Sequence, residues 1–418
     1  MLLFLFASIV QTILPVNTHA KELEQTTRDT PMPNSLAKLY SSVNDTYPHE
    51  NELIGDVRQI YNGTLFPDIQ VNTFRNTHRL FPTRLVRAGS ETLPFPKAKH
   101  QLQNFIFRDQ GKSWDLFDFL SLNRVGGIVV IKEGEIAFER YLLGNSPSTK
   151  WMSMSVVKSM VATLVGVAIH DGFIDNIDDP VIRYLPNLAG SAYDKVSIRQ
   201  LLQMSSGVAW NEAYTQANSD RRAMLEAQIS QKPGSILELM TRLESAAKPG
   251  TRWNYSTGET QVVAALVAAA TGKKVSNYFS EKIWQPFGMQ SDASWWLDSP
   301  GGVEIGGSGL SATLRDYARF GLYMLNEGKI AGVDTLPQGW NAQATQPQNI
   351  DGKIVNYGYM WWPADNDAYL AIGIFGQFIY VNPKSKTVIA MWSAQPKPEG
   401  TNVIDEFVFF NAVVDALP

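Results

Sequence analysis

Apolar residues form two different kinds of run in the central part of the chain. Residues 126–131 and 136–141 are β-prone runs joined by a turn that contains Gly134, and this pattern predicts a β-hairpin. Residues 160–169 are apolar on nearly every side of a helix, and helices of that kind are buried. The pattern therefore predicts a hairpin followed by a helix that runs through the centre of a domain.

The C-terminal part of the chain returns to strand patterns. Three runs rich in β-branched and aromatic residues predict strands, at residues 357–362, 377–381 and 387–392. A final helix is predicted from Val403 to about Leu417, and a mainly helical region fills about residues 175–300. Early and late strands around a helical middle are typical of an α+β fold in which both chain ends build one antiparallel sheet.

The first twenty residues predict a secretory signal peptide. Residues 2–10 are an apolar run, and Ala20 ends a small-residue cleavage site. The alternative is an uncleaved membrane anchor, but the run is shorter than the ~20 residues that a span needs. We therefore expect cleavage after Ala20, a periplasmic or secreted protein, and no further membrane-spanning segment.

The next stretch, residues 21–110, is polar, weakly periodic and punctuated by prolines. We interpret it as an N-terminal extension that packs on a main domain of residues 111–418. The chain is 418 residues long and 44% hydrophobic, which suffices for a large core.

The amino-acid composition excludes several classes of binding and catalytic function. A net charge of −4 gives none of the basic character of a nucleic-acid-binding protein. The absence of cysteine excludes disulfides, cysteine nucleophiles and thiolate metal sites. Neither a histidine pair at metal-binding spacing nor a glycine-rich nucleotide loop occurs. We therefore predict no metal and no cofactor.

The candidate nucleophile is Ser155, which begins a Ser-x-x-Lys string directly before the buried helix. Positions i and i+3 share a helix face, so the Lys158 amine can lie beside the Ser155 hydroxyl. Burial and the positive helix end both lower the pKa of an amine, and a neutral lysine can activate a serine. The same string occurs at residues 35–38 and 245–248, where no apolar helix follows.

The histidines argue against a Ser-His-Asp triad. His170 lies about 18 Å farther along the predicted helix than Lys158. The others lie in the predicted signal peptide or extension, at His19, His49, His78 and His100. A nucleophilic serine would therefore need a lysine, tyrosine or carboxylate as its base.

A second string, residues 249–258, places a Pro-Gly turn before Tyr255 at the start of another apolar helix. This arrangement would present the phenol at the edge of a loop. The alternative is that the Tyr255 ring packs over the loop and has no chemical role.

The strings at Ser155 and Tyr255, about one hundred residues apart, resemble those of the serine hydrolases in the β-lactamase and penicillin-binding-protein superfamily. The similarity is strongest to the class C branch, and within it to the esterases and 6-aminohexanoate-dimer hydrolases. It extends from about Ile60 and includes the segments 63–75, 201–207, 309–316 and 376–383. The resemblance implies a β-lactamase-like α+β fold.

The resemblance also implies site roles. Ser155 would be the acylated nucleophile and Lys158 its proton acceptor. Tyr255 would carry the proton to the leaving group and then activate the deacylating water. The backbone N–H groups of Ser155 and Ile374 would form an oxyanion hole. Substrate contacts are implied for Trp210, Tyr214 and Gly373.

Two departures from the class C pattern concern substrate choice. Thr257 stands where class C β-lactamases have asparagine, and residues 371–373 (Ala-Ile-Gly) replace their Lys-Thr-Gly. That lysine helps to bind the carboxylate of a β-lactam or a D-Ala-D-Ala end. Its loss removes a charge-assisted contact of about 1.5–3 kcal/mol. We therefore expect a small-molecule ester or small linear amide as substrate.

Two alternatives stay open. A D,D-peptidase or β-lactamase would act on peptidoglycan-like or β-lactam substrates, as other members of the superfamily do. An exported binding protein would keep the fold without turnover.

Overall fold

The structure is a computed structural model and describes residues 47–418. The predicted signal peptide, its cleavage after Ala20 and residues 21–46 of the predicted extension lie outside the described residues. Pro48–Pro418 form one compact unit. None of the helices in residues 47–418 combines the length and apolar character that a membrane crossing requires.

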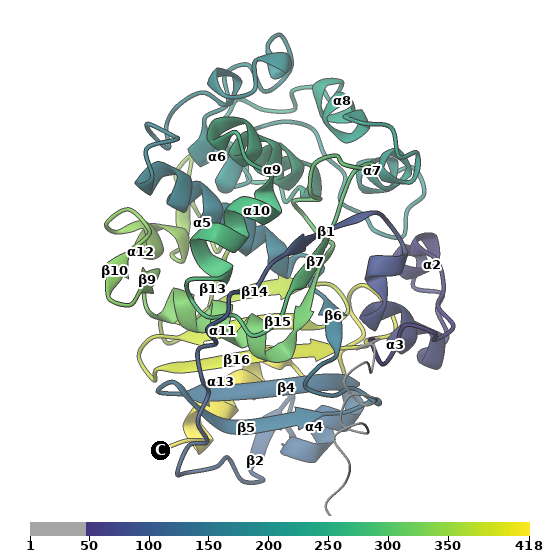
Figure 1. Cartoon of the computed structure of the whole chain (residues 1–418), viewed down its shortest axis with the longest axis vertical. Helices are drawn as coiled ribbons and strands as arrows, with labels where there is room; N and C mark the ends of the chain where they lie inside the picture. The colour runs from purple at the N-terminus through teal and green to yellow at the C-terminus, as the bar shows by residue number, and fades with distance from the viewer. Residues whose placement is uncertain (1–46) are drawn as a thin grey trace, which may run out of the picture. The chain divides into compact units, whose positions relative to one another are not determined.

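A six-stranded antiparallel sheet, built from both ends of the described chain, confirms the predicted α+β architecture (Figure 1). The early strands form the predicted hairpin, and the late strands extend the sheet beside it. In spatial order the strands are β13 (Trp362–Pro363), β14 (Tyr369–Gly373), β15 (Gln377–Asn382), β16 (Thr387–Ser393), β4 (Val125–Lys132) and β5 (Glu135–Tyr141).

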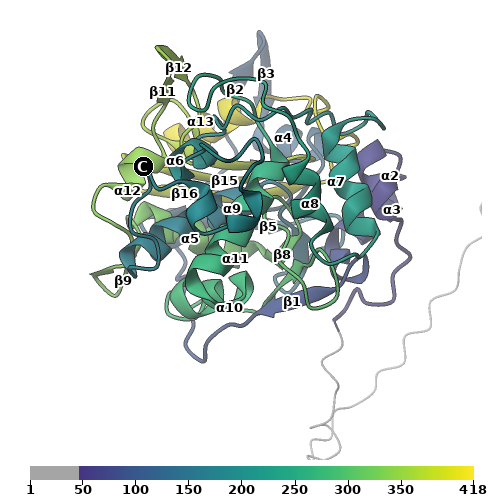
Figure 2. The same cartoon turned by 90° about the horizontal axis from the view of Figure 1, so that it is seen from above.

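Both faces of this sheet are buried. In β4, Val129 and Ile131 belong to one core, whereas Ile128 and Val130 belong to another. This alternation follows from the two-residue period of a strand. Helices cover each face (Figure 2): the first core receives α5 (Val156–His170), α9 (Thr257–Thr271) and α11 (Leu314–Leu325), and the second receives α4 (Leu116–Leu122) and α13 (Glu406–Ala416).

Two predicted boundaries were wrong. Residues 357–361 form no strand, and β13 begins only at Trp362. Tyr357, Met360 and their neighbours are buried in a loop, so their composition reflects burial and not strand pairing. The last helix begins at Glu406 because the side chain of Asp405 caps it by accepting hydrogen bonds from two backbone N–H groups.

The predicted extension contributes to a second sheet of four antiparallel strands. Its order is β1 (Thr83–Val86), β7 (Ala293–Trp296), β8 (Leu310–Thr313) and β6 (Lys150–Met152). The extension also supplies α2 (Val57–Asn62) and α3 (Pro67–Arg75), and α3 packs against β6. The strand β6 leads directly into α5, so this sheet supports the start of that helix.

The segment predicted as a helical insertion, residues 175–300, holds most of the other helices and also the strand β7. The remaining helices of the described chain are η1 (Thr77–Arg79), η2 (Val181–Arg183), η3 (Pro186–Leu188), α6 (Ile198–Leu202), α7 (Asp220–Ile229), α8 (Ser235–Thr241), α10 (Val275–Phe279), η4 (Ser280–Trp284) and α12 (Trp340–Ala344). Small ribbons pair β2 (Ile106–Asp109) with β3 (Lys112–Asp115), β9 (Lys329–Ile330) with β10 (Val333–Asp334), and β11 (Gln348–Ile350) with β12 (Lys353–Val355).

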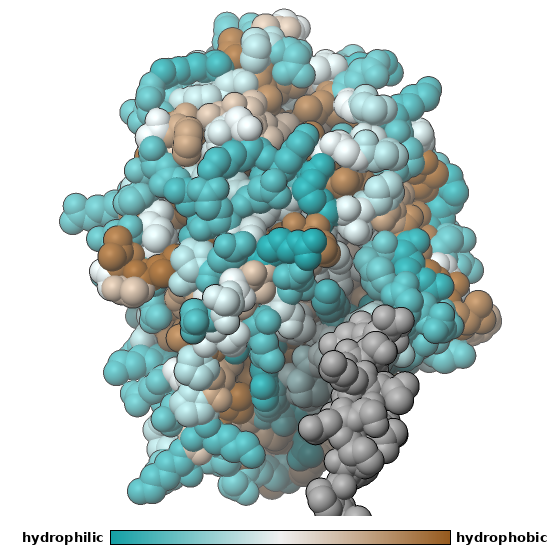
Figure 3. All heavy atoms as spheres, viewed as in Figure 1, coloured by the Kyte–Doolittle hydropathy of each residue, from teal (hydrophilic) through white to brown (hydrophobic). Residues whose placement is uncertain are grey.

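Hydrophilic residues dominate the visible, non-grey part of the face in Figure 3, and hydrophobic residues occur there as scattered patches. The large aromatic side chains lie inside, and six tryptophans are among the largest fully buried ones. Burial of this apolar surface is the main stabilising contribution to such a fold.

Candidate active site

Ser155 lies at a sharp turn between β6 and α5. The preceding Met154 has φ +42°, a left-handed conformation that is uncommon for a residue with a side chain. Ser155 itself is the N-cap of α5, as predicted, and it lines a cavity. The turn therefore redirects the chain from strand to helix and presents the Ser155 hydroxyl at the cavity wall.

Lys158 lies one turn along α5 and is 2% exposed. Its Nζ is 3.1 Å from Ser155 Oγ, 2.9 Å from Thr257 Oγ1 and 2.9 Å from the carbonyl oxygen of Gly307. Burial lowers the pKa of Lys158 to about 7, while the charge of Glu212 acts in the opposite direction. A substantial fraction of the amine is therefore neutral near pH 7 and able to accept a proton from Ser155.

The Tyr255 ring packs beside the same two residues. Lys158 Nζ lies 5.4 Å from the ring centroid, and Trp362 packs at 5.9 Å between ring centroids. Burial raises the pKa of Tyr255, and the charge of Glu212 raises it further, while a hydrogen bond with Ser155 acts in the opposite direction. The phenol is therefore neutral at ordinary pH and can serve as a proton donor.

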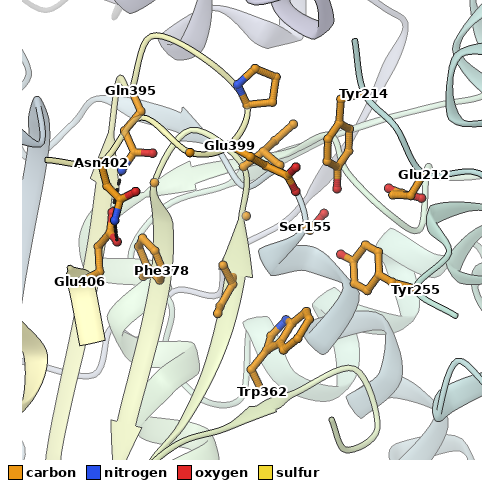
Figure 4. A pocket seen from close by; sticks show the side chains of 16 residues that line it. Ser155, Glu212, Tyr214, Tyr255, Trp362, Phe378, Gln395, Glu399, Asn402 and Glu406 are labelled. Atoms are coloured by element: carbon orange, nitrogen blue, oxygen red, sulfur yellow. Dashed lines mark hydrogen bonds between the residues drawn. The ribbon is translucent and has the colours of Figure 1, made fainter. Parts of the chain in front are cut away.

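A cavity of about 440 Å³ opens in front of these groups, and Tyr255, Tyr214, Glu212 and Glu399 surround Ser155 in Figure 4. Glu406 lies at the opposite side, where it accepts hydrogen bonds from Gln395 and Asn402. The lining residues are Ser155, Glu212, Tyr214, Tyr255, Trp362, Ile372, Gly373, Ile374, Gly376, Phe378, Gln395, Pro398, Glu399, Gly400, Asn402 and Glu406.

The predicted oxyanion-hole residues meet at this cavity. Gly373 ends β14, and Ile374 begins the turn that follows it. A Cβ at Gly373 would lie 3.0 Å from the backbone nitrogen of Ser155, so only glycine lets the two segments approach this closely. Backbone N–H groups at such a junction can stabilise a developing oxyanion. The roles of Ser155 and Ile374 there stay predictions.

The predicted substrate contacts separate into two groups. Tyr214 and Gly373 line the cavity beside Ser155. Trp210 is not among the described residues that line it, and it borders a different cavity of about 310 Å³. Its indole Nε1 donates a hydrogen bond to Glu212 at 2.5 Å, so Trp210 supports a lining residue instead of forming the lining.

Sequence reasoning missed Glu212. Its carboxylate accepts hydrogen bonds from the backbone N–H of Thr257 at 2.8 Å and from the Thr257 hydroxyl. An acidic residue in a loop ordinarily lies in solvent, and its distance of 45 residues from Thr257 leaves no local signal. Its position two residues before the predicted contact Tyr214 was the only available clue.

The competing motifs do not form a comparable site. Ser245 and Lys248 are exposed outside any helix, and the string at residues 35–38 lies outside the described residues. His170 occupies the last turn of α5, as predicted. No group of three or more metal-binding side chains comes together within residues 47–418.

Comparison with known proteins agrees with this architecture. The Beta-lactamase family model matches residues 121–409. A 6-aminohexanoate-dimer hydrolase of Paenarthrobacter ureafaciens is 30% identical over 302 residues, which cover 68% of this chain and 76% of that enzyme.

Two solved structures share the fold. A Bacillus anthracis protein provisionally described as a 6-aminohexanoate-dimer hydrolase superposes with a TM-score of 0.74 at 24% identity, covering 84% of this chain and 93% of the other. A family VIII carboxylesterase superposes with a TM-score of 0.55 at 18% identity, and the match covers 70% of this chain and 92% of the carboxylesterase. The chain therefore belongs to the β-lactamase family and is related to its hydrolases.

Proposed function

We propose that the protein is an exported serine hydrolase that cleaves carboxylic esters or small linear amides through an acyl-enzyme on Ser155. The observation that carries the proposal is the buried Lys158 amine, 3.1 Å from Ser155 Oγ beside a cavity that can hold a small substrate. The names of the relatives, a 6-aminohexanoate-dimer hydrolase and a carboxylesterase, support an amide or ester substrate.

The chemistry begins with proton transfer from Ser155 Oγ to the neutral amine of Lys158. The Oγ attacks the substrate carbonyl carbon, and the N–H groups of Ser155 and Ile374 stabilise the oxyanion. Tyr255 donates its proton to the leaving alcohol or amine as the C–O or C–N bond breaks, and Lys158 returns a proton to Tyr255. A water then attacks the acyl-enzyme and loses its proton to Tyr255, which passes its own phenolic proton to neutral Lys158. Lys158 returns that proton to Ser155 Oγ as the acyl C–Oγ bond breaks, which releases the acid and restores Ser155.

The charges of the cavity support a neutral or cationic acyl donor. Among the described residues that line it, Glu212, Glu399 and Glu406 carry carboxyl groups, and no lysine, arginine or histidine is present. The position aligned with the third-motif lysine of class C β-lactamases is Ala371, which is fully buried. Among the described lining residues, an anionic substrate would therefore find carboxyl groups and no compensating cation.

The decisive experiment measures hydrolysis of neutral p-nitrophenyl esters and small linear amides by the wild type and by Ser155→Ala. We expect Ser155→Ala to lose turnover at least 1,000-fold while its circular dichroism is unchanged. Ser245→Ala is the matched control, because it removes the serine of the other described Ser-x-x-Lys string. Undiminished turnover in Ser155→Ala would refute the proposal.

The alternatives predict different covalent chemistry. A penicillin adduct on Ser155 in intact-mass spectra, together with faster hydrolysis of anionic than of neutral acyl donors, would favour a D,D-peptidase or β-lactamase. Failure of a fluorophosphonate to label Ser155 would favour a binding protein without turnover. Export is tested separately: the mature protein recovered outside the cytoplasm should begin at Lys21.

A further inference from the structure

We propose that Thr257 and Glu212 are a pair of positioning residues that direct the lone pair of neutral Lys158 toward the Ser155 hydroxyl. The inference rests on the proposed serine-hydrolase function and deepens it. The hydrogen bonds run without interruption from Glu212 to the Thr257 hydroxyl, from there to Lys158 Nζ, and on to Ser155 Oγ.

The Thr257 hydroxyl has only one proton to donate. The Glu212 carboxylate oxygens accept hydrogen bonds, one of them from the Thr257 hydroxyl. The carboxylate itself is held by two further donors, the backbone N–H of Thr257 and the indole of Trp210. Because its proton is committed to Glu212, Thr257 must act as an acceptor toward Lys158.

Neutral Lys158 has two N–H groups and one lone pair, and three oxygens surround its Nζ. The carbonyl oxygen of Gly307 can only accept, so it takes one N–H at 2.9 Å. Thr257 Oγ1 takes the second N–H, also at 2.9 Å. The lone pair is left for the remaining neighbour, the Ser155 hydroxyl at 3.1 Å.

Without Glu212, the Thr257 hydroxyl could rotate and donate to Lys158 instead. The lone pair of Lys158 would then accept the Thr257 proton, and one Lys158 N–H would point at Ser155 Oγ. In that orientation the amine donates to Ser155 and cannot accept its proton. The pair therefore selects the reactive orientation of the amine before substrate binds, and general bases depend on such alignment.

The charged and titratable groups that act on Lys158 have separable effects. Glu212 raises the pKa of Lys158, Arg221 lowers it, and the Tyr255 ring faces the amine. Glu212→Gln removes the negative charge and also supplies an N–H₂ donor that competes with the Thr257 proton. It should therefore change both the rate and the pH dependence, which a purely structural role would not do.

The test compares Thr257→Val, Thr257→Ser and Glu212→Gln with wild type on one neutral ester. We expect kcat to fall at least tenfold in Thr257→Val, with KM changed less than threefold. Thr257→Ser, which keeps the hydroxyl, should recover activity to within about threefold of wild type. Glu212→Gln should lower kcat and move the acidic limb of the kcat/KM profile to lower pH.

Thr271→Val is the matched control, because it removes a buried hydroxyl at the far end of the same helix, where the hydroxyl donates only to the helix backbone. If Thr257→Val does not fold, the isosteric variant Glu212→Gln still tests the inference. The measurement is then the rate at which a fluorophosphonate labels Ser155. Wild-type kcat and an unmoved pH profile in Glu212→Gln, or a folded Thr257→Ser without activity, would overturn the inference. Turnover that persists in Ser155→Ala would instead refute the proposed function itself.

Discussion

Gly373 approaches Ser155 so closely that a Cβ at residue 373 would lie 3.0 Å from the Ser155 backbone nitrogen and 2.6 Å from the carbonyl oxygen of Ser153. The end of β14 and the start of α5 therefore meet with no room for a side chain. This contact places the Ile374 backbone at the same cavity as Ser155. Within residues 371–373, Gly373 provides a close backbone junction, and none of the three residues carries a positive charge.

Gly373→Ala should impair catalysis by forcing this junction apart. We expect kcat for a neutral ester to fall by about 100–1,000-fold, the range seen when one oxyanion-hole donor is removed. Steady-state kinetics and a thermal melt will separate lost activity from lost folding. Gly89→Ala is a suitable control, since its added Cβ meets ordinary contacts of 3.4 Å or more. Wild-type kinetics in Gly373→Ala would contradict the role of this junction.

Lys158 should determine the acidic limb of the pH profile. Burial lowers the pKa of Lys158 to about 7, and only the neutral amine can take the Ser155 proton. We therefore expect kcat/KM to rise with pH through about 7 and then level off. Lys158→Met should lose activity at least 100-fold at every pH, whereas Lys248→Met, in the exposed string, should match wild type. A flat profile from pH 5.5 to 8.5 would disprove the assignment.

Tyr255→Phe should distinguish substrates by their leaving groups. The variant keeps the ring packing against Tyr357 and Trp362 but removes the phenolic proton. Amines need a proton to leave, whereas p-nitrophenolate does not, so we expect a loss at least tenfold greater for an amide than for the acylation step with a p-nitrophenyl ester. Burst-phase kinetics measure that step, and Tyr380→Phe, on the sheet, serves as control. Equal losses on both substrates would contradict leaving-group protonation by Tyr255.

Glu259 should make stability depend on pH. It is 2% exposed, its Oε2 has no hydrogen-bond partner among the described residues, and burial raises its pKa to about 8. An unfolded glutamate has a pKa of about 4.3, so the folded state binds the extra proton and stability falls as pH rises through that window to about 8.

Glu259→Gln should remove this loss, because it keeps the acceptor for Ser206 without a titrating charge. We expect its free energy of unfolding to exceed that of wild type at pH 9 by on the order of 2–4 kcal/mol, with a smaller difference at pH 5. Urea unfolding at both pH values measures this, with the exposed Glu244→Gln as control. A difference that does not grow with pH would show that Glu259 stays ionised in the folded protein.

Local sequence patterns were sufficient to predict the hairpin, the buried helix and the position of Lys158 beside Ser155. A two-residue or i, i+3 relationship is set by strand and helix geometry within one element, so nearby residues encode it. The same local evidence misjudged residues 357–361, because burial in a loop selects the aromatic residues that also favour strands. The substrate contact of Trp210 was implied by the family resemblance and not by a local pattern; it stays a prediction, and in the structure the Trp210 indole donates a hydrogen bond to Glu212.

The sequence by itself determined which serine has a lysine on its helix face, and that this helix is buried. Only the tertiary structure decided how that lysine is oriented and what surrounds it. Thr257 and Gly307 contact Lys158 from 99 and 149 residues away, and Glu212 acts on it through Thr257. Gly373 approaches Ser155 from more than 200 residues away. Such meetings depend on the packing of the whole domain, because no short-range periodicity relates segments so far apart in the chain.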